Sequence, residues 1–177
     1  MMNKLTVFLD DHSFEQKPTP QEAAMIRKRL RRQEITRVEL FSALINGQTV
    51  LPAVCDEQKQ FQFQQVFFVD VDGGRTLQEN MKLCRSYQLY PALAYRTFSG
   101  GQFPNRHRLL FVLEDAITDP DKRDAMQEAL TRCFGGDPCT KDRSRLFYGA
   151  KRPLLQLGMN VSSETAERFL REWSADG

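Results

Sequence analysis

The chain has 177 residues, of which 41% are hydrophobic and 27% charged, a composition typical of a globular protein with its own core. Its net charge of +2 does not by itself indicate a nucleic-acid partner. The 4 cysteines form no CxxC pair and only 2 histidines are present, which excludes zinc-finger and haem-attachment motifs. The longest purely apolar run, residues 109–113, is too short to span a membrane, and the N-terminal residues lack a signal-peptide pattern, so we expect a cytoplasmic protein without a membrane partner.

Five helices are predicted, four of them from capping signals. In three places a threonine is followed three residues later by a glutamate, a pair that satisfies free N–H groups in the first helical turn. These signals predict helices from residue 20 to about 33, from 37 to 47 and from 77 onward. Asp119 and Pro120 open a fourth helix that Gly135 ends, and a last helix is expected over roughly 163–173.

Strand patterns lie between these helices, at residues 65–72, 92–98, 108–114 and 145–148. The order β-α-β-β-α-β predicts an α+β fold of the RRM-like or ferredoxin-like type, with both helices on one face and the first strand between the third and fourth. A hairpin turn is expected at 99–101.

The chain is expected to form one compact domain with three parts. Residues 1–60, with strands near 5–9 and 50–55, are predicted to form an α/β prefix packed on the core. Residues 61–157 would form the RRM-like unit, and residues 158–177 would add a C-terminal helix.

Two aspartates close the strand predicted over 65–72. Asp70 and Asp72 share one face of this strand, and Phe67, Val69 and Val71 share the other. We expect the apolar set to face the helices and the carboxylates to lie on the open face of the sheet, where they would bind hard divalent cations. Paired divalent cations are a common device for nucleotidyl transfer. An alternative is that Asp72 and the two glycines after it only form a turn that closes the strand, without binding a metal.

Basic residues are predicted near the same carboxylates. If the apolar residues of 109–113 face the helices, Arg106 and Arg108 join the aspartates, and His107 points the other way into a structural role. Together with acids, such residues suit metals and a triphosphate, whereas the alternative is a salt-bridged surface. The region of the fourth strand adds further basic residues: Lys141, Arg145 and Lys151.

Three segments resemble the catalytic core of the archaeo-eukaryotic primase (AEP) superfamily, in the prim-pol branch of bacterial plasmids, phages and integrative elements. They are FFVDVD at 67–72, AYRTFSGGQFPNRHRLLFVLE at 94–114 and GGDPCTKDRSRLFYG at 135–149. Such primases have a strand ending in hhhDhD, a second strand bearing Ser-x-His, and a third acidic position ahead of an arginine-containing strand. The resemblance spans roughly residues 35–152 and implies that the RRM-like sheet is a catalytic palm.

The resemblance also implies a role for individual residues. Asp70 and Asp72 match the first motif and Asp137 the third, with Asp142 as its competitor; the three acids would be catalytic and hold two Mg²⁺ or Mn²⁺ ions. Arg108 stands where the family has histidine, as in a related subgroup encoded on mobile elements. The residues that would then contact the nucleotide are Arg108, Arg145, Lys141, Lys151 and Arg106.

Two basic clusters predict contacts with nucleic acid. Residues 25–37 contain six basic residues and one glutamate, a run that attracts phosphates through counterion release, although such runs are often only a solvated helix face. The second cluster, residues 141–152, borders the predicted site. The residues expected to bind nucleic acid are Arg27, Arg31, Arg143 and Arg152.

The leading hypothesis is therefore a DNA primase or primase-polymerase domain from the replication module of a mobile element. It would use a single-stranded DNA template and nucleoside triphosphates, and work with a replicative helicase in cis or in trans. The alternative is a catalytically silent AEP-like domain that binds single-stranded nucleic acid and initiates replication. A rolling-circle nuclease is disfavoured because the chain has no His-hydrophobic-His pair.

Overall fold

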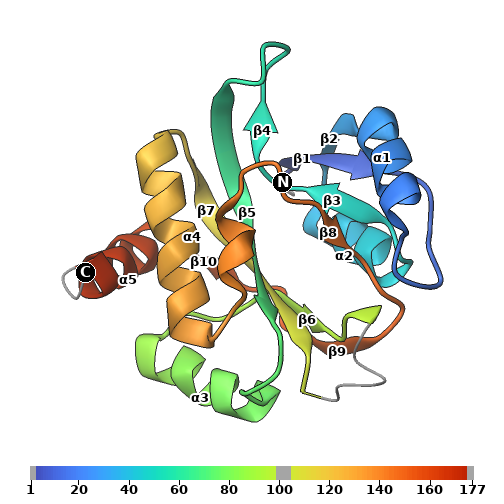
Figure 1. The fold of residues 1–177 in the computed structure, drawn as a ribbon. Coiled ribbons are helices and arrows are strands. Elements are labelled where there is room, and N and C mark those ends of the chain that lie inside the picture. Colours follow the sequence, from blue (N-terminus) through green and yellow to red (C-terminus); the bar gives the residue numbers. More distant parts are fainter. Residues whose placement is uncertain (1–2, 99–104, 175–177) are drawn as a thin grey trace.

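The computed structural model describes residues 3–98 and 105–174, so the turn predicted at 99–101 lies outside the described residues. The chain forms two β-sheets with helices around them (Figure 1). Helices α3, α4 and α5 lie on one side of the larger sheet, and the smaller sheet lies on the other with α1 and α2. Among the helices described, none has the length and apolar character needed to cross a membrane.

The N-terminal part of the chain builds most of the smaller sheet. Its strands follow the order β2-β1-β3-β8 and are antiparallel to their neighbours. Their bounds are β1 Leu5–Asp10, β2 Arg31–Ile35, β3 Thr49–Leu51 and β8 Phe147–Tyr148. Two helices accompany them, α1 Pro20–Arg29 and α2 Arg37–Ile45, capped by Thr19 and Thr36 as predicted.

The first helix is shorter than predicted. It ends at Arg29 instead of near residue 33, and Arg31–Ile35 forms β2, which pairs with β1 over its whole length. Local propensity favoured a helix there, but the free edge of β1 supplies backbone partners that the sequence pattern did not reveal.

The larger sheet has the order β4-β5-β7-β6-β9, with β10 paired to β7 off this path. Strands β5 and β7 are long and antiparallel, and their register places Asp70 opposite Arg108. Pairing along the path is antiparallel, whereas β10 runs parallel to its partner. The bounds are β4 Val54–Cys55, β5 Phe61–Val71, β6 Leu93–Tyr95, β7 His107–Ile117, β9 Pro153–Gln156 and β10 Asn160–Val161.

The predicted RRM-like strand order is wrong for the fourth strand. Residues 147–148 pair with β3 in the smaller sheet and not with β5. The ring of Phe147 stacks on that of Phe68 with centroids 4.4 Å apart, so the segment crosses the face of the larger sheet. The turn after α4 instead lies along the edge of β5 near the C-terminal end of that strand, where Gly136 forms a bridge with Val71.

The helices of the larger sheet are α3 Leu77–Tyr87, α4 Pro120–Phe134, the short 3₁₀ helix η2 Pro138–Lys141, and α5 Ser163–Ser174. The prediction for β5 is confirmed on this side, since Phe67, Val69 and Val71 pack in one core cluster with residues of α3, α4 and α5. Burial of this apolar face is the main source of stability for the layer.

The opposite face of the larger sheet is not open, contrary to the prediction. Phe68, Leu110 and Val112 form a second core cluster with Leu5 and Val7 of β1. An RRM-like unit alone would leave this face to solvent, but the apolar residues of the prefix cover it. Toward the end of β5, a cleft borders Asp70 and Asp72.

Candidate active site

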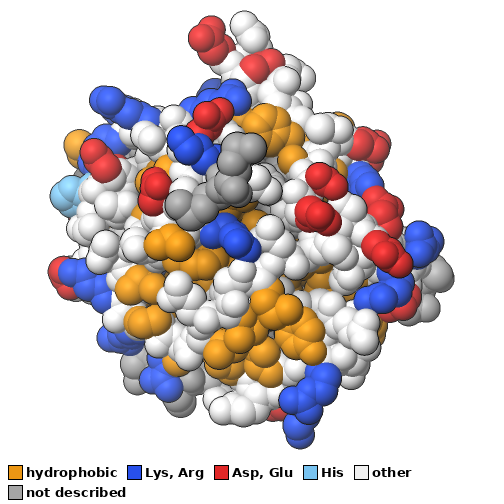
Figure 2. All heavy atoms as spheres, turned by 180° about the vertical axis from the view of Figure 1, so that it is seen from behind, with side chains coloured by type: hydrophobic (Ala, Val, Ile, Leu, Met, Phe, Trp, Pro, Cys, Tyr) orange, Lys and Arg blue, Asp and Glu red, His pale blue; other side chains and the backbone are white. Residues whose placement is uncertain are grey.

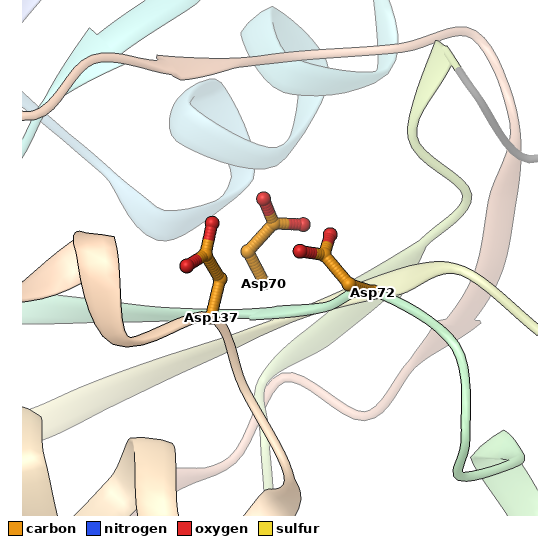
Figure 3. Close-up of side chains that lie close together, drawn as sticks. All are labelled: Asp70, Asp72 and Asp137. Atoms are coloured by element: carbon orange, nitrogen blue, oxygen red, sulfur yellow. The ribbon is translucent and has the colours of Figure 1, made fainter.

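Three carboxylates gather at the end of β5. Asp70 lies in β5, Asp72 directly follows its last residue, and Asp137 comes from the turn between α4 and η2. Figure 3 shows the three side chains directed into the same space. One oxygen of each lies within 4.8 Å of the others, and the burial differs, with Asp70 buried, Asp137 half-buried and Asp72 exposed.

The backbone of the turn after α4 brings Asp137 to the strand. Gly135 ends α4 in the left-handed conformation, with φ of 71°. The amide of Asp137 donates to the carbonyl oxygen of Asp70 at 2.8 Å. At Gly136 a Cβ would lie 2.6 Å from a methyl carbon of Val69, so a residue without a side chain lets the turn approach this closely.

Asp142, the competitor of Asp137, lies outside the triad. Its carboxylate accepts hydrogen bonds from the amide and the hydroxyl of Ser144, each at 2.8 Å. These hydrogen bonds also lower the pKa of Asp142. Asp142 thus caps a turn, and the structure groups Asp137 with Asp70 and Asp72.

The pKa of Asp72 is raised above the ordinary value of an aspartate. Although the residue is exposed as a whole, partial loss of hydration of its carboxyl contributes most to the increase, followed by the negative charges of Asp70 and Asp137, while Arg106 and Arg108 act in the opposite direction. Three carboxylates this close repel one another, and a bound cation would relieve that repulsion.

Arg108 is buried against the triad. Its guanidinium lies 3.2 Å from a carboxylate oxygen of Asp70, and it donates to the carbonyl of Tyr148 at 2.6 Å and to the hydroxyl of Tyr95 at 3.3 Å. Burial alone would lower the pKa of Arg108, but the charge of Asp70 and the contacts with Tyr95 raise it above the ordinary value. The prediction that Arg108 shares the face of the aspartates is confirmed.

His107 points away from the site, as predicted. Its Nε2 lies 3.1 Å from the amide of Asn80 in α3, and its Nδ1 donates to the carbonyl of Asn105 at 2.8 Å. Burial lowers the pKa of His107, although the Asn105 hydrogen bond and the charge of Asp70 oppose that shift.

The triad lies in a cleft of about 400 Å³ between the two sheets. Of the predicted basic residues, Arg27, Arg106, Arg108 and Arg145 line it. Arg27 also donates to the carbonyl of Ser144 at 2.9 Å, which connects α1 to the segment before β8. The remaining lining residues, which the sequence did not single out, are Lys17, Ala23, Thr97, Phe98, Leu146 and Tyr148.

Other predicted basic residues do not line this cleft. Lys141 pairs with Glu128 at 3.1 Å, Lys151 pairs with Glu15, and Arg143 pairs with Asp124 at 2.6 Å. Arg31 and Arg152 are exposed outside it. No feature of the sequence near Lys17 indicated that it would reach the cleft, because its position depends on the packing of α1.

Comparison with known proteins gives matches among solved structures. The AEP domain of the primase-polymerase of cyanophage S-2L matches with a TM-score of 0.54 and 13% identity, covering 94% of this chain and 89% of that one. The primase RepB' matches with a TM-score of 0.53 and 12% identity, and this chain spans 58% of its length. The catalytic domain of RepB' in complex with initiator DNA matches with a TM-score of 0.52 and 12% identity, covering 99% of this chain and 87% of that one.

The chain has the fold of AEP primase domains. It is a mixed α and β architecture with antiparallel sheets, and the resemblance stated from the motifs is confirmed at the level of the fold. No family model and no curated protein matches the sequence.

Proposed function

We propose that the chain belongs to the AEP superfamily and is the catalytic domain of a DNA primase or primase-polymerase, which performs metal-dependent, template-directed nucleotidyl transfer. The observation that carries this proposal is the convergence of Asp70, Asp72 and Asp137 in a cleft that also holds basic side chains. The fold shared with primase domains supports the same chemistry.

The donor set fits a hard divalent cation. Carboxylate oxygens are the ligands that Mg²⁺ and Mn²⁺ prefer, and three of them lie within 4.8 Å of one another. Asp70, Asp72 and Asp137 would hold a pair of such ions, which would polarise the reacting phosphoryl group and favour a nucleophilic oxygen. The chain itself would fix the separation of the ligands through the backbone contact between Asp137 and Asp70.

The cleft suits a nucleoside triphosphate. Its volume of about 400 Å³ is that of a small-molecule site, and Arg106 and Arg145 supply cationic donors for phosphate oxygens beside the acids. Lys17 and Arg27 extend the positive charge toward α1. Arg108 would act mainly by holding Asp70, since its contacts already fix it to the protein.

The template would be single-stranded DNA. Arg27 and Arg31 lie on the N-terminal basic run, and Arg143 and Arg152 belong to the second cluster. One of the matching structures is a primase bound to initiator DNA, which supports a DNA partner. The proposal includes a role in the replication of a mobile element together with a helicase, since the chain has no P-loop sequence for unwinding.

A second candidate is an AEP-like domain that binds single-stranded DNA without catalysis. The observation that favours it is the ion pair between Arg108 and Asp70, because a guanidinium at 3.2 Å competes with a metal ion for that carboxylate. Metal binding by the triad separates the two candidates.

The test is incorporation of labelled nucleotides on single-stranded DNA with Mg²⁺ or Mn²⁺, with and without a primer. We expect activity in the natural sequence and none in Asp70→Ala/Asp72→Ala or Asp137→Ala. The matched control is Asp142→Ala, an acidic residue of the same segment that caps a turn outside the triad, and it should remain active.

The outcomes separate the candidates. Activity without a primer indicates a primase, and activity only with a primer indicates a polymerase. An inactive natural protein that binds single-stranded DNA equally well with and without the Asp70 and Asp72 carboxylates would favour the silent domain instead.

A further inference from the structure

A row of polar side chains on α4 is buried beside the edge of β5 that the fourth strand was predicted to pair with. Arg123, Gln127 and Thr131 are spaced four residues apart and therefore share one face of the helix. Their exposed fractions are 1%, 0% and 3%. We name these three residues the polar ladder. Buried polar groups cost free energy unless they are hydrogen-bonded, so the partners of the ladder indicate what it does.

The first two residues of the ladder bind the edge of β5. Arg123 donates from Nε to the side-chain oxygen of Gln64 at 2.7 Å, and Gln127 donates to the carbonyl of Phe68 at 2.8 Å. The ladder therefore provides hydrogen bonds along the edge that the fourth strand was expected to pair.

Helix α4 also holds both ends of the segment that carries Asp137. At one end, the backbone carbonyl of Thr131 accepts a hydrogen bond from the amide of Gly136 at 2.7 Å, so this contact belongs to the C-terminus of the helix and not to a side chain of the ladder. At the other, Arg123 donates to the carbonyl of Lys141, the last residue of η2, at 2.7 Å.

Thr140 connects the ladder to Asp137 itself. Its hydroxyl donates to the carbonyl of Asp137 at 2.7 Å and lies 3.4 Å from the hydroxyl of Thr131. Thr140 is fully buried, so this contact is not shared with solvent. The segment from 136 to 141 is thus held against β5 by α4, in addition to the bridge between Gly136 and Val71 and the backbone contact between Asp137 and Asp70.

We propose that Arg123, Gln127 and Thr131 are positioning residues that set the distance of the Asp137 carboxylate from Asp70 and Asp72. This inference rests on the proposed metal-dependent function and adds residues that do not touch the carboxylates. Asp70 and Asp72 are placed by the sheet, but Asp137 lies on a turn, so its position depends on what anchors that turn. When a group that orients a metal ligand without itself binding the metal is replaced, the metal affinity typically falls by 10- to 100-fold.

The experiment compares Thr131→Val and Arg123→Met with the natural sequence in two measurements. Amide hydrogen exchange at Asp137, whose amide donates to the carbonyl of Asp70, reports whether the turn stays on β5, and Mn²⁺ titration followed by electron paramagnetic resonance reports the affinity of the triad. We expect faster exchange at Asp137 and an affinity for Mn²⁺ about tenfold lower, in protein that is still folded.

Matched controls come from the other sheet. Thr49→Val makes the same isosteric change at a buried threonine of β3, and Arg29→Met removes an arginine that pairs with a buried aspartate, Asp10. Both controls should change global stability without changing exchange at Asp137 or the Mn²⁺ affinity. If Arg123→Met fails to fold, Thr131→Val, which keeps the volume of the side chain, decides the matter.

The result that would overturn the inference is unchanged Mn²⁺ affinity in the folded variants, or unchanged exchange at the amide of Asp137. A natural protein that does not bind Mn²⁺ would instead refute the proposed function, and the exchange measurement would still show whether the ladder holds the turn. The two failures are therefore distinguishable.

Discussion

Asp10 and Asp70 are both buried and each pairs with an arginine, but the two ion pairs differ in whether the carboxylate can still bind a further group. Asp10 in β1 is fully buried, and Arg29 holds both of its oxygens at 2.9 Å and 2.8 Å. Asp70 in β5 has one ion-pair contact with Arg108, at 3.2 Å, and two further carboxylates beside it. The first pair is a closed structural contact, whereas the second leaves a carboxylate facing other acids.

The difference arises from the partners of each arginine. Arg29 directs two nitrogens to the same carboxylate, a bidentate geometry that satisfies both groups. Arg108 directs a nitrogen to the carbonyl of Tyr148 and the hydroxyl of Tyr95. The pair at Asp70 thus balances part of the negative charge of the triad and leaves capacity for metal ligation.

The strongest test of this contrast is the exchange of each aspartate for asparagine. Asp70→Asn removes a ligand charge from the triad, and we expect nucleotidyl transfer to fall by more than about a hundredfold, because even groups behind metal ligands contribute 10- to 100-fold. Asp10→Asn should leave the specific activity of the folded protein unchanged. Rates measured at saturating Mn²⁺ check both, and equal losses in the two variants would contradict the comparison.

Removing Arg108 should leave the negative charge of the triad without its nearest cation. Arg108→Met leaves Asp70 without its cation, and we expect the metal-free protein to lose about 3 kcal/mol of stability, the lower range for breaking a buried ion pair. Mn²⁺ should restore more stability in this variant than in the natural sequence, since binding to the folded state is coupled to unfolding.

Denaturant unfolding with and without Mn²⁺ measures both effects of Arg108→Met. A variant as stable as the natural sequence without metal would show that Arg108 does not compensate the charge of Asp70.

Breaking the ion pair between Asp10 and Arg29 should have a smaller effect, and this effect should be on stability and not on metal binding. Asp10→Asn removes the charge of a fully buried carboxylate, but the side chain of Arg29 is 33% exposed and remains partly hydrated. We therefore expect a loss of about 2 kcal/mol, below the usual cost of breaking a fully buried pair. Urea unfolding at neutral pH measures this loss, and Mn²⁺ should not reduce it. A loss that Mn²⁺ reverses would show that the two pairs are coupled.

Local sequence signals predicted the elements that depend on near neighbours. The caps at Thr19, Thr36 and Thr76 lie where expected, because a capping box uses residues only three apart. The alternation along β5 also predicted the face of Asp70 and Asp72, since the period of a strand is fixed by its backbone.

Predictions failed where distant segments decide the structure. The strand at 147–148 joined β3 because Phe147 packs on Phe68, a contact between residues far apart in the chain. Strands β9 and β10 are short and mostly exposed, so they carry no period-two pattern to recognise.

The same limit applies to the basic residues of the candidate site. Lys141 and Arg143 each pair with an acid of α4, 13 and 19 residues away, and Lys151 pairs with Glu15 across 136 residues. Charge clusters in the sequence do not show such partners. The position of Asp137 was suggested by the resemblance to primases, and the geometry of Gly136 supplies its physical reason.

The smallest predicted effect concerns the histidine behind the site. His107 is buried and neutral, and burial lowers its pKa below the ordinary value near 6.5. As pH falls below about 6.5, the unfolded chain binds a proton at this position that the folded chain does not, so stability falls by up to about 1.4 kcal/mol per pH unit until the pKa of the folded state is reached. Above pH 6.5 this contribution is fully present. Unfolding between pH 5 and 8 should show this slope, and His107→Gln, which cannot titrate, should remove it. An identical slope in His107→Gln would show that the proton binds elsewhere.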